Sequence, residues 1–437
     1  MSAGLDVKVV GAGLAGCEAA WQVAQRGIPV ELIEMKPNKR SPAHISNDFA
    51  ELVCSNSLRS NELTNAVGLL KEEMRRLGSL IIKCADETSV PAGGALAVDR
   101  ERFSSMVTET VRRHPLITVT EREQIDMPEG RVIIATGPLT SDNLAEKLAS
   151  LLPDEKLLSF FDSAAPIVTL ESIDLDYAYF ASRYGKGDSD YINCPMNREE
   201  YKMFHSALIC ADEAHIHGFE DKLVFEGCIP IEIMARRGED TIRYGPLKPV
   251  GLPDPKTGKE PYAVVQLRKD NAEGTLYNIV GFQTHLKFTE QKRVFSMIPA
   301  LHKAQYVRFG VMHRNTYLDS PKLLDRYNRL KSDPRISFAG QITGVEGYVE
   351  SASSGLLTGI EMAREMRNMY PVNFPGETAI GALALYTAGG AIADFQPMNI
   401  NFGLIEPLGS KVKGKRSKNL AISQRSLAII DKLRVEI

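Results

Sequence analysis

Apolar residues near the start of the chain recur with two different spacings. Residues 7–10 form a short β-branched run, residues 17–25 follow a helical pattern, and residues 29–34 form a second apolar run that ends in Glu34. β-Branched runs favour strands, whereas apolar residues spaced three and four apart favour helices. This order predicts a βαβ unit, in which a helix connects two neighbouring parallel strands.

The turn between the first strand and the helix carries a G-x-G-x-x-G motif in the context that dinucleotide binding requires. Gly11 permits a tight turn, Gly13 lets the backbone approach a pyrophosphate, and Gly16 allows close packing of helix on strand. Glu34 ends the second strand, where a carboxylate can accept hydrogen bonds from both hydroxyls of an adenosine ribose. We therefore expect Glu34 to bind a dinucleotide together with the whole loop, which comprises Gly11, Ala12, Gly13, Leu14, Ala15 and Gly16.

Strand and helix patterns return in later segments. Residues 99–114 read as an amphipathic helix, and residues 131–137 are a buried-strand run that ends in Ala-Thr-Gly. Residues 336–340 predict another strand, followed by a helix of small residues over 344–366. We include Gly137 and Gly340, which close the two strand runs, among the expected cofactor contacts.

The pattern changes between residues 150 and 300, where short strands alternate with loops that contain many aromatic residues. This change predicts an inserted domain over 151–305. The two parts of the first domain would then cover 1–150 and 306–437. We predict an α/β fold, in which a Rossmann domain carries a smaller inserted α/β domain.

Composition narrows the function only slightly. The 437 residues are 43% hydrophobic and 24% charged, with a formal net charge of −3, so no global field indicates a nucleic-acid partner. The tail over 411–437 is locally basic, with eight basic and two acidic residues, and is either a solvated surface helix or a phosphate contact. The uncharged run over 378–393 is too short and too rich in glycine to span a membrane. We expect no export signal.

The six cysteines form no C-x-x-C pair, and this excludes the usual zinc motifs. His215 and His217 form an H-x-H pair without an evident third ligand, so we expect no metal site. Scattered cysteines in a long chain are typical of a reducing cytoplasm. The cysteines are Cys17, Cys54, Cys84, Cys194, Cys210 and Cys228.

Six motifs occur together and in order, and they resemble the TrmFO family of bacterial folate- and FAD-dependent tRNA uracil-5-methyltransferases. The resemblance extends over essentially the whole chain, including residues 395–399. The motifs are GAGLAGCEAAWQ (11–22), FAELVCSNSLRSN (49–61), PAGGALAVDR (91–100), ATGPLTS (135–141), GVMHRNTY (310–317) and GVEGYVESASSG (344–355).

The resemblance implies a glutathione-reductase-like Rossmann domain that binds FAD and carries a smaller insertion. It also implies methylation of C5 of the uridine at T-loop position 54 of tRNA, with the methylene group taken from 5,10-methylenetetrahydrofolate. Reduced FAD would convert the methylene to a methyl, tetrahydrofolate would be released, and NAD(P)H would reduce the flavin again. No protein partner is implied. We expect Glu346, Gly347 and Tyr348, at the start of the small-residue helix, to contact the flavin, with His313 and Arg314 nearby.

Such a reaction needs thiol chemistry, because C5 of uracil becomes nucleophilic only after a group has added to C6. Cys228 lies shortly before Arg236, Arg237 and Arg243, whose charges favour a thiolate, and we assign it as the C6 nucleophile. Cys54 follows the first βαβ unit, and the family has cysteines at both places. We assign Cys54 as the second catalytic thiol, either as a base or as protector of the flavin-bound methylene. We expect the other four cysteines to be packed as small apolar residues.

Three alternatives follow from the same residues. A sister family that modifies wobble uridine together with a GTPase carries a further C-terminal helical region, for which we expect too little chain after residue 400. The same chemistry on ribosomal RNA stays open. A flavin-binding RNA chaperone without catalysis stays open as well, although it would not need two thiols beside a flavin.

Overall fold

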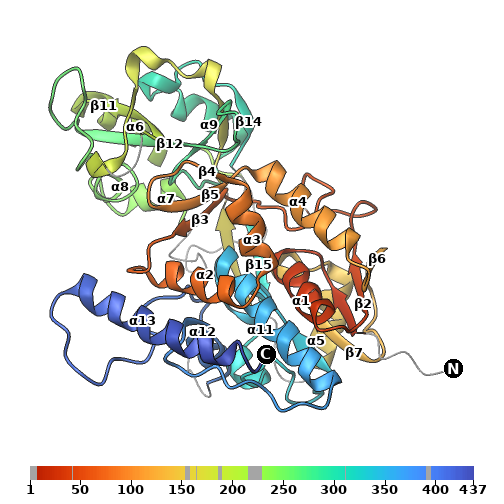
Figure 1. Cartoon of the computed structure of the whole chain (residues 1–437). Helices are drawn as coiled ribbons and strands as arrows, with labels where there is room; N and C mark the ends of the chain where they lie inside the picture. Colours follow the sequence, from red (N-terminus) through yellow and green to blue (C-terminus); the bar gives the residue numbers. More distant parts are fainter. Residues whose placement is uncertain are drawn as a thin grey trace.

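A five-stranded parallel sheet forms the base of the molecule (Figure 1). The computed structural model describes residues 7–41, 43–152, 158–163, 165–185, 189–214, 229–310, 312–389 and 395–437. The strands of the sheet, in spatial order, are β16 (Ile336–Phe338), β7 (Arg131–Ile134), β1 (Val7–Val10), β2 (Val30–Glu34) and β6 (Ile117–Glu121). All four neighbouring pairs are parallel. The predicted βαβ unit is therefore confirmed, with α1 (Leu14–Gln25) as its helix.

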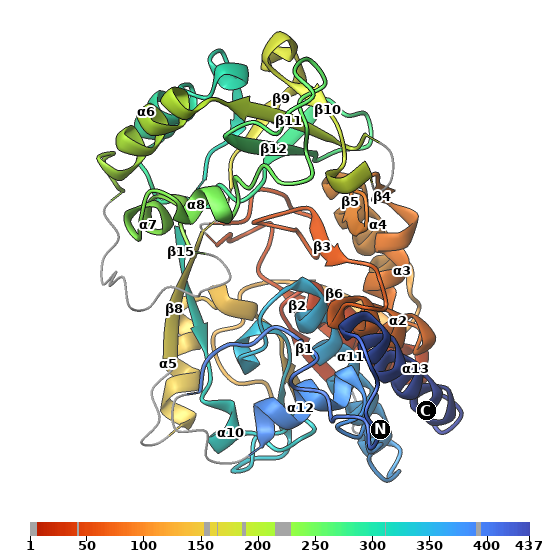
Figure 2. The same ribbon diagram turned by 90° about the vertical axis from the view of Figure 1, so that its left-hand side faces the viewer.

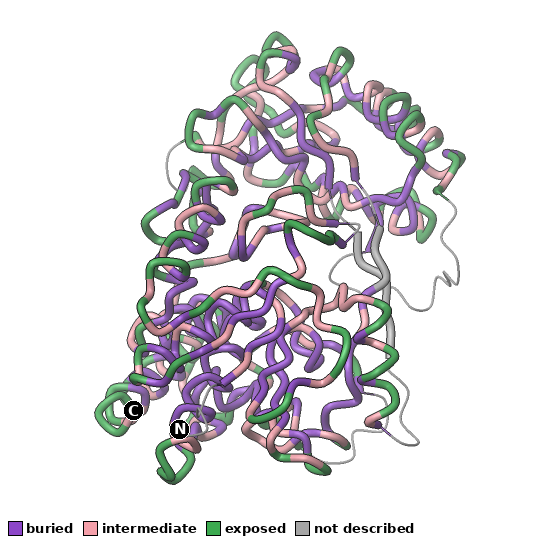
Figure 3. The backbone as a smooth tube through the Cα atoms, turned by 90° about the vertical axis from the view of Figure 1, so that its right-hand side faces the viewer, coloured by how far each residue is buried: buried purple, intermediate pink, exposed green. Residues whose placement is uncertain are grey.

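Both faces of this sheet are covered, as a parallel sheet requires. Val7 and Val9 point into a core shared with α1, with α4 (Arg100–Arg113) and with α11 (Tyr348–Met366). Val10 belongs to a second core, on the side of α5 (Asp142–Leu151). Figure 3 shows buried positions concentrated in the interior of the molecule and exposed ones mostly at its periphery.

Helices α1 and α11 lie in direct backbone contact. A Cβ atom added at Gly355 would overlap the carbonyl oxygen of Ala15, and one added at Gly359 would lie 2.6 Å from the carbonyl oxygen of Ala19. The small residues of α11 therefore allow two helices to touch. The helix begins at Tyr348 rather than near residue 344, because two glycines before it have φ of +81° and +109°.

A second domain is built on a six-stranded sheet and lies at the top of Figure 1. Its neighbouring strands pair antiparallel, and α6 (Arg198–Ile209), α7 (Ile231–Arg236) and α9 (Phe288–Phe295) pack on the same core. The strands, in spatial order, are β10 (Tyr179–Phe180), β11 (Tyr191–Met196), β12 (Ala263–Lys269), β13 (Leu276–Ile279), β9 (Ile167–Thr169) and β14 (Tyr306–Arg308). Strand β14 belongs to this sheet although it follows the sequence-based limit at residue 305. The domain limits themselves stay a prediction.

Two smaller sheets accompany the two large ones. Strands β8 (Leu158–Ser163) and β15 (Met312–Tyr317) form an antiparallel ribbon where the chain leaves and re-enters the Rossmann domain. A three-stranded sheet of β3 (Ser57–Ser60), β5 (Ala95–Val98) and β4 (Ser89–Val90) lies between the domains (Figure 2).

The C-terminal segment closes the lower side of the Rossmann domain. Helix α13 (Lys415–Leu433) packs on α2 (Ala66–Arg76), with α12 (Ala379–Ala388) nearby, as Figure 2 shows. Ile422 and Ile430 of α13 are buried, whereas its basic N-terminal turn is exposed. Among the described residues, no helix is long and apolar enough to cross a membrane.

Candidate functional site

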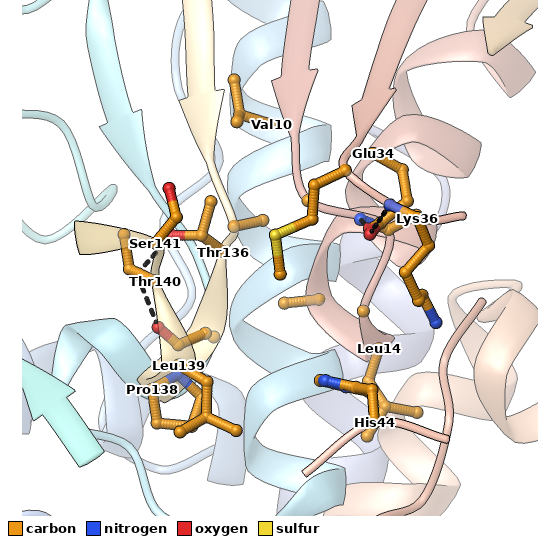
Figure 4. A pocket seen from close by; sticks show the side chains of 18 of the residues that line it. Val10, Leu14, Glu34, Lys36, His44, Thr136, Pro138, Leu139, Thr140 and Ser141 are labelled. Atoms are coloured by element: carbon orange, nitrogen blue, oxygen red, sulfur yellow. Dashed lines mark hydrogen bonds between the residues drawn. The ribbon is translucent and has the colours of Figure 1, made fainter. Parts of the chain in front are cut away.

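A deep pocket opens at the carboxyl ends of the parallel strands, the edge where ligands bind in open α/β sheets. Its volume is about 1110 Å³, with the open mouth included. Figure 4 shows Glu34, Lys36 and His44 on one side of it, and Thr136 and Pro138 on the other.

The glycine loop forms the floor of this pocket. Gly11 has φ of +99°, and a Cβ atom there would lie 2.7 Å from the carbonyl oxygen of Ala135, the residue after β7. A Cβ atom at Gly16 would overlap the carbonyl oxygen of Gly11, so this glycine lets α1 start against β1. At Gly13, by contrast, no described atom lies within 4 Å of the added Cβ. The loop therefore combines two packed glycines with one that faces open space.

Glu34 fixes the shape of the loop. Its side chain is buried, Oε2 accepts a hydrogen bond from the Ala12 N–H at 2.7 Å, and Oε1 accepts one from the Lys36 N–H at 3.0 Å. The carboxylate thus joins the glycine loop to the end of β2. Each carboxylate oxygen can accept a second hydrogen bond, so these contacts leave capacity for a ligand hydroxyl.

The opposite wall comes from the turns after β7 and β16. The hydroxyls of Thr136 and Thr140 lie 2.6 Å apart, and Thr140 also donates to the Gly137 carbonyl at 3.0 Å. Gly137 and Gly340 adopt φ of +67° and +84°, which other residues rarely adopt. These turns let the chain leave both strands without filling the pocket.

Cys54 is not part of the pocket lining, but it lies beside Tyr348, which is. The Tyr348 oxygen accepts hydrogen bonds from the Cys54 N–H at 2.8 Å and the Ser55 N–H at 3.3 Å, and it lies 3.0 Å from the Cys54 sulfur. Tyr348 and Val53 both line the pocket. Burial, and then the charge of Cys54, raise the pKa of Tyr348 well above its ordinary value, so the phenol stays protonated.

The structure brings most of the predicted cofactor residues together in this pocket. The lining residues among them are Gly11, Ala12, Gly13, Leu14, Ala15, Glu34, Gly137, Gly340 and Tyr348. Gly16, Glu346 and Gly347 are not part of the lining. Gly16 packs against Gly11, and Glu346 accepts a hydrogen bond from the lining residue Gln341 at 2.6 Å. Their roles in binding stay predictions.

The remaining predicted residues are separate from the pocket or outside the described chain. Cys228, His215 and His217 lie outside the described residues, as do the side chains of His313 and Arg314. Cys17, Cys84 and Cys194 are buried, as expected. Cys210 is exposed at the end of α6, so the expectation of burial was wrong there. Across the described residues, no three His, Cys, Asp or Glu side chains are arranged to hold a metal ion.

Several lining residues were not anticipated from the sequence. They contribute charged or polar groups to the pocket. Thr136 and Ser351 lie inside two of the six motifs, at 135–141 and 344–355, whereas the others lie outside every motif and only the folded chain identifies them. They are Lys36, His44, Arg122, Glu123, Gln124, Thr136, Gln341 and Ser351.

Comparisons with known proteins agree with this geometry. The family model described as "Glucose inhibited division protein A" matches residues 6–370. A protein of Acetivibrio thermocellus named "Methylenetetrahydrofolate--tRNA-(uracil-5-)-methyltransferase TrmFO" is 60% identical over 97% of both chains. The protein of the same name from Desulfitobacterium hafniense is 57% identical over 98% of both chains.

A solved structure supports the fold independently. The structure of Aquifex aeolicus GidA in its form II crystal superposes with a TM-score of 0.70 at 16% identity, covering 98% of this chain and 73% of that one. The expected flavoprotein-type α/β fold is thereby confirmed. With the full-length matches above, these findings show that the chain belongs to the TrmFO family, within the group described as glucose inhibited division protein A.

Proposed function

We propose that this chain methylates C5 of the uridine at T-loop position 54 of tRNA. The methylene group comes from 5,10-methylenetetrahydrofolate, FAD is the cofactor, and NAD(P)H is the final reductant. The support for uracil-5 methylation of tRNA with methylenetetrahydrofolate is a relative that carries these words in its name and is 60% identical over 97% of both chains. Position 54, FAD and NAD(P)H come from the family resemblance. A reaction on tRNA that uses thiols is expected in the reducing cytoplasm.

The pocket residues fit an adenine dinucleotide. The open space at Gly13, next to the N-terminus of α1, leaves room for a pyrophosphate facing backbone N–H groups. Glu34 lies where the adenosine ribose is expected, and Tyr348 lies toward the rim with Cys54. When bound, FAD would supply the electrons that convert the methylene to a methyl group.

The position of Cys54 is the observation that favours catalysis over simple binding. Its sulfur contacts Tyr348, which lines the pocket, so a thiol lies at the edge of the cofactor site. A flavin-binding RNA chaperone has no need for that arrangement. Cys228 keeps its role as C6 nucleophile from the sequence and the family resemblance alone.

The direct test combines FAD-loaded protein, methylenetetrahydrofolate, NADPH and a tRNA transcript, with the methylated position mapped by mass spectrometry. We expect 5-methyluridine at position 54 alone, and its loss in Cys54→Ala. Cys210→Ala is the matched control, because Cys210 is exposed on α6 in the other domain. Methylation of ribosomal RNA instead, or full activity in Cys54→Ala, would contradict the proposal.

A further inference from the structure

The loop that carries Cys54 is held from both domains. Arg100, the first residue of α4, donates to the Leu52 carbonyl and makes two hydrogen bonds with Asp270, at 2.8 and 3.1 Å. Arg268 on β12 of the inserted domain donates to Ser55 Oγ at 2.7 Å and to Asn56 Oδ1 at 3.0 Å. The residues on either side of Cys54 are thus bonded to two arginines, of which Arg268 is buried and Arg100 is half-buried.

Asn56 completes the attachment. Its side-chain amide donates to the carbonyl of Val98 on β5 and to the carbonyl of Lys269 on β12, both at 2.8 Å. One side chain next to the thiol therefore joins a strand of each domain. The loop geometry depends on the docking of the inserted domain.

The hydrogen bonds that the Tyr348 oxygen accepts determine where its own hydroxyl hydrogen points. A phenol oxygen accepts through two lone pairs and donates one hydrogen. The backbone N–H groups of Cys54 and Ser55 point at the oxygen as donors, so its own hydrogen is left to donate. The Cys54 sulfur, 3.0 Å away, is placed to accept it. A sulfur that accepts this proton is favoured as a thiolate.

Among the described residues, positive charge exceeds negative charge around this sulfur. Arg100 lies close enough to Cys54 and Tyr348 for their charges to interact, and Arg268 and Arg308 face Arg100. Arg268 is buried and Arg308 is half-buried, yet guanidinium groups stay protonated in proteins.

Two carboxylates of the described chain interact with these three arginines. Asp270 is buried and pairs with Arg100, whereas Glu51 lies near Arg308 and accepts from the N–H groups of Ile45 and Ser46. Arg268 donates to neutral oxygens of Ser55 and Asn56, also interacts with Tyr191, and shares the negative charge of Asp270 with Arg100. Three guanidinium groups therefore face two carboxylates at the loop that carries the thiol.

We propose that Arg268 is a positioning residue that, together with Tyr348 and Arg100, holds the Cys54 loop and keeps its sulfur ionised near neutral pH. The inserted domain thereby activates a thiol of the Rossmann domain, and the thiol proton passes to solvent. This inference rests on the proposed function for the catalytic use of Cys54, but the ionisation is measurable without RNA or folate.

The test measures the alkylation rate of Cys54 by iodoacetamide as a function of pH, in the FAD-loaded protein, by mass spectrometry of the Cys54 peptide. In the wild type, half-maximal reactivity should fall below pH ~8.5, the value of an ordinary thiol. Arg268→Gln removes the charge and should raise the midpoint by about one pH unit. Arg268→Lys keeps the charge and should restore most of the shift.

Arg183→Gln is the matched control. Arg183 also belongs to the inserted domain and also bonds β12, through Gln266 at 3.1 Å, but its hydrogen bonds end at Gln266 and at the carbonyls of Lys248 and Val250. We expect the wild-type midpoint in this variant. Flavin absorbance and melting temperature establish that each variant is folded.

An unchanged midpoint in folded Arg268→Gln, or an equal shift in Arg183→Gln, would overturn the proposal. If Arg268→Gln does not fold, Tyr348→Phe and Arg268→Lys decide. A raised midpoint in Tyr348→Phe with a near-normal one in Arg268→Lys supports it, and a wild-type midpoint in Tyr348→Phe overturns it. Failure of the proposed function has a different signature, because Cys54→Ala would then still methylate tRNA whatever the alkylation profile.

Discussion

The two ends of the pocket are built in different ways. The floor of the nucleotide end comes from one βαβ unit, and its shape depends on Gly11, Gly16 and the Glu34 side chain, which lie close together in the sequence. The thiol end consists of side chains from separate segments, among them Tyr348 and Arg268. Local geometry therefore shapes the cofactor end, whereas the reactive end exists only after distant segments have assembled.

The largest effect is expected from a substitution that disrupts the nucleotide end of the pocket. Gly16→Ala places a methyl group on the Gly11 carbonyl, so α1 must move away from β1. We expect loss of bound FAD and a stability loss of about 1–3 kcal/mol, measured by flavin absorbance and urea unfolding. Gly13→Ala is the matched variant, because its Cβ meets open space, and it should keep wild-type stability while binding FAD more weakly. A yellow Gly16→Ala protein of normal stability would refute the packing argument.

The next largest effect is expected from substitutions of the two thiols, which leave the nucleotide end of the pocket intact. With RNA that carries 5-fluorouracil at the target, the C5 substituent cannot leave as a proton, so a covalent adduct at C6 should accumulate. Cys228→Ala should form no adduct that survives denaturing electrophoresis. Cys54→Ala should still form it but lose methylation by roughly 10²-fold or more.

Both variants should keep FAD, since neither cysteine lies in the glycine loop. If Cys228→Ala still formed the covalent RNA adduct and Cys54→Ala did not, the roles of the two cysteines would have to be exchanged. Adducts in both variants would show that neither thiol is obligatory.

A smaller effect concerns a second contact between segments that are distant in the sequence, where α2 meets α12 and α13. Glu73 is fully buried, accepts from the N–H groups of Ala379 and Ile380 at 2.7 and 2.9 Å, and bonds the Ser426 hydroxyl. Burial raises its pKa from 4.5 to about 7. Glu361 has the same shift, also by burial.

Between pH 4.5 and 7, these two carboxyls are therefore protonated in the folded state but ionised in the unfolded chain. The contribution of these carboxyls to the free energy of unfolding is largest below pH 4.5 and is lost as pH rises to about 7. Urea unfolding at several pH values should show a smaller decline over this window in Glu73→Gln than in the wild type. If the free energy of unfolding declined equally in both proteins, Glu73 would not have a raised pKa in the folded state.

The smallest effect concerns a region outside both ends of the pocket. Neutralising Lys411, Lys413, Lys415 and Arg416 removes exposed charges before and within the first turn of α13. If these side chains contact phosphates, tRNA affinity at moderate salt should fall about tenfold, with a shallower salt dependence. The flavin spectrum should not change. Unaltered affinity would leave the tail as a solvated surface.

The sequence predicted the features that depend on neighbouring residues. The strands around Gly11 and Glu34 and the amphipathic helix α4 follow from periodicity and a local motif. The approach of Arg268 to the Cys54 loop could not be predicted, because more than 200 residues separate them and neither lies in a pattern that implies contact. The exposure of Cys210 was missed for a related reason, since a cysteine at a helix end has no periodicity to place it.

The backbone contact between α1 and α11 also sets an order of events during synthesis. Its two glycines on α11 emerge from the ribosome roughly 300 residues after α1, which at ~10 residues per second is on the order of half a minute. Until then the apolar face of α1 and the β7 edge of the sheet lack their partners, α11 and β16. The nascent Rossmann domain is therefore exposed to misassembly for that interval, and its completion must wait for the last third of the chain.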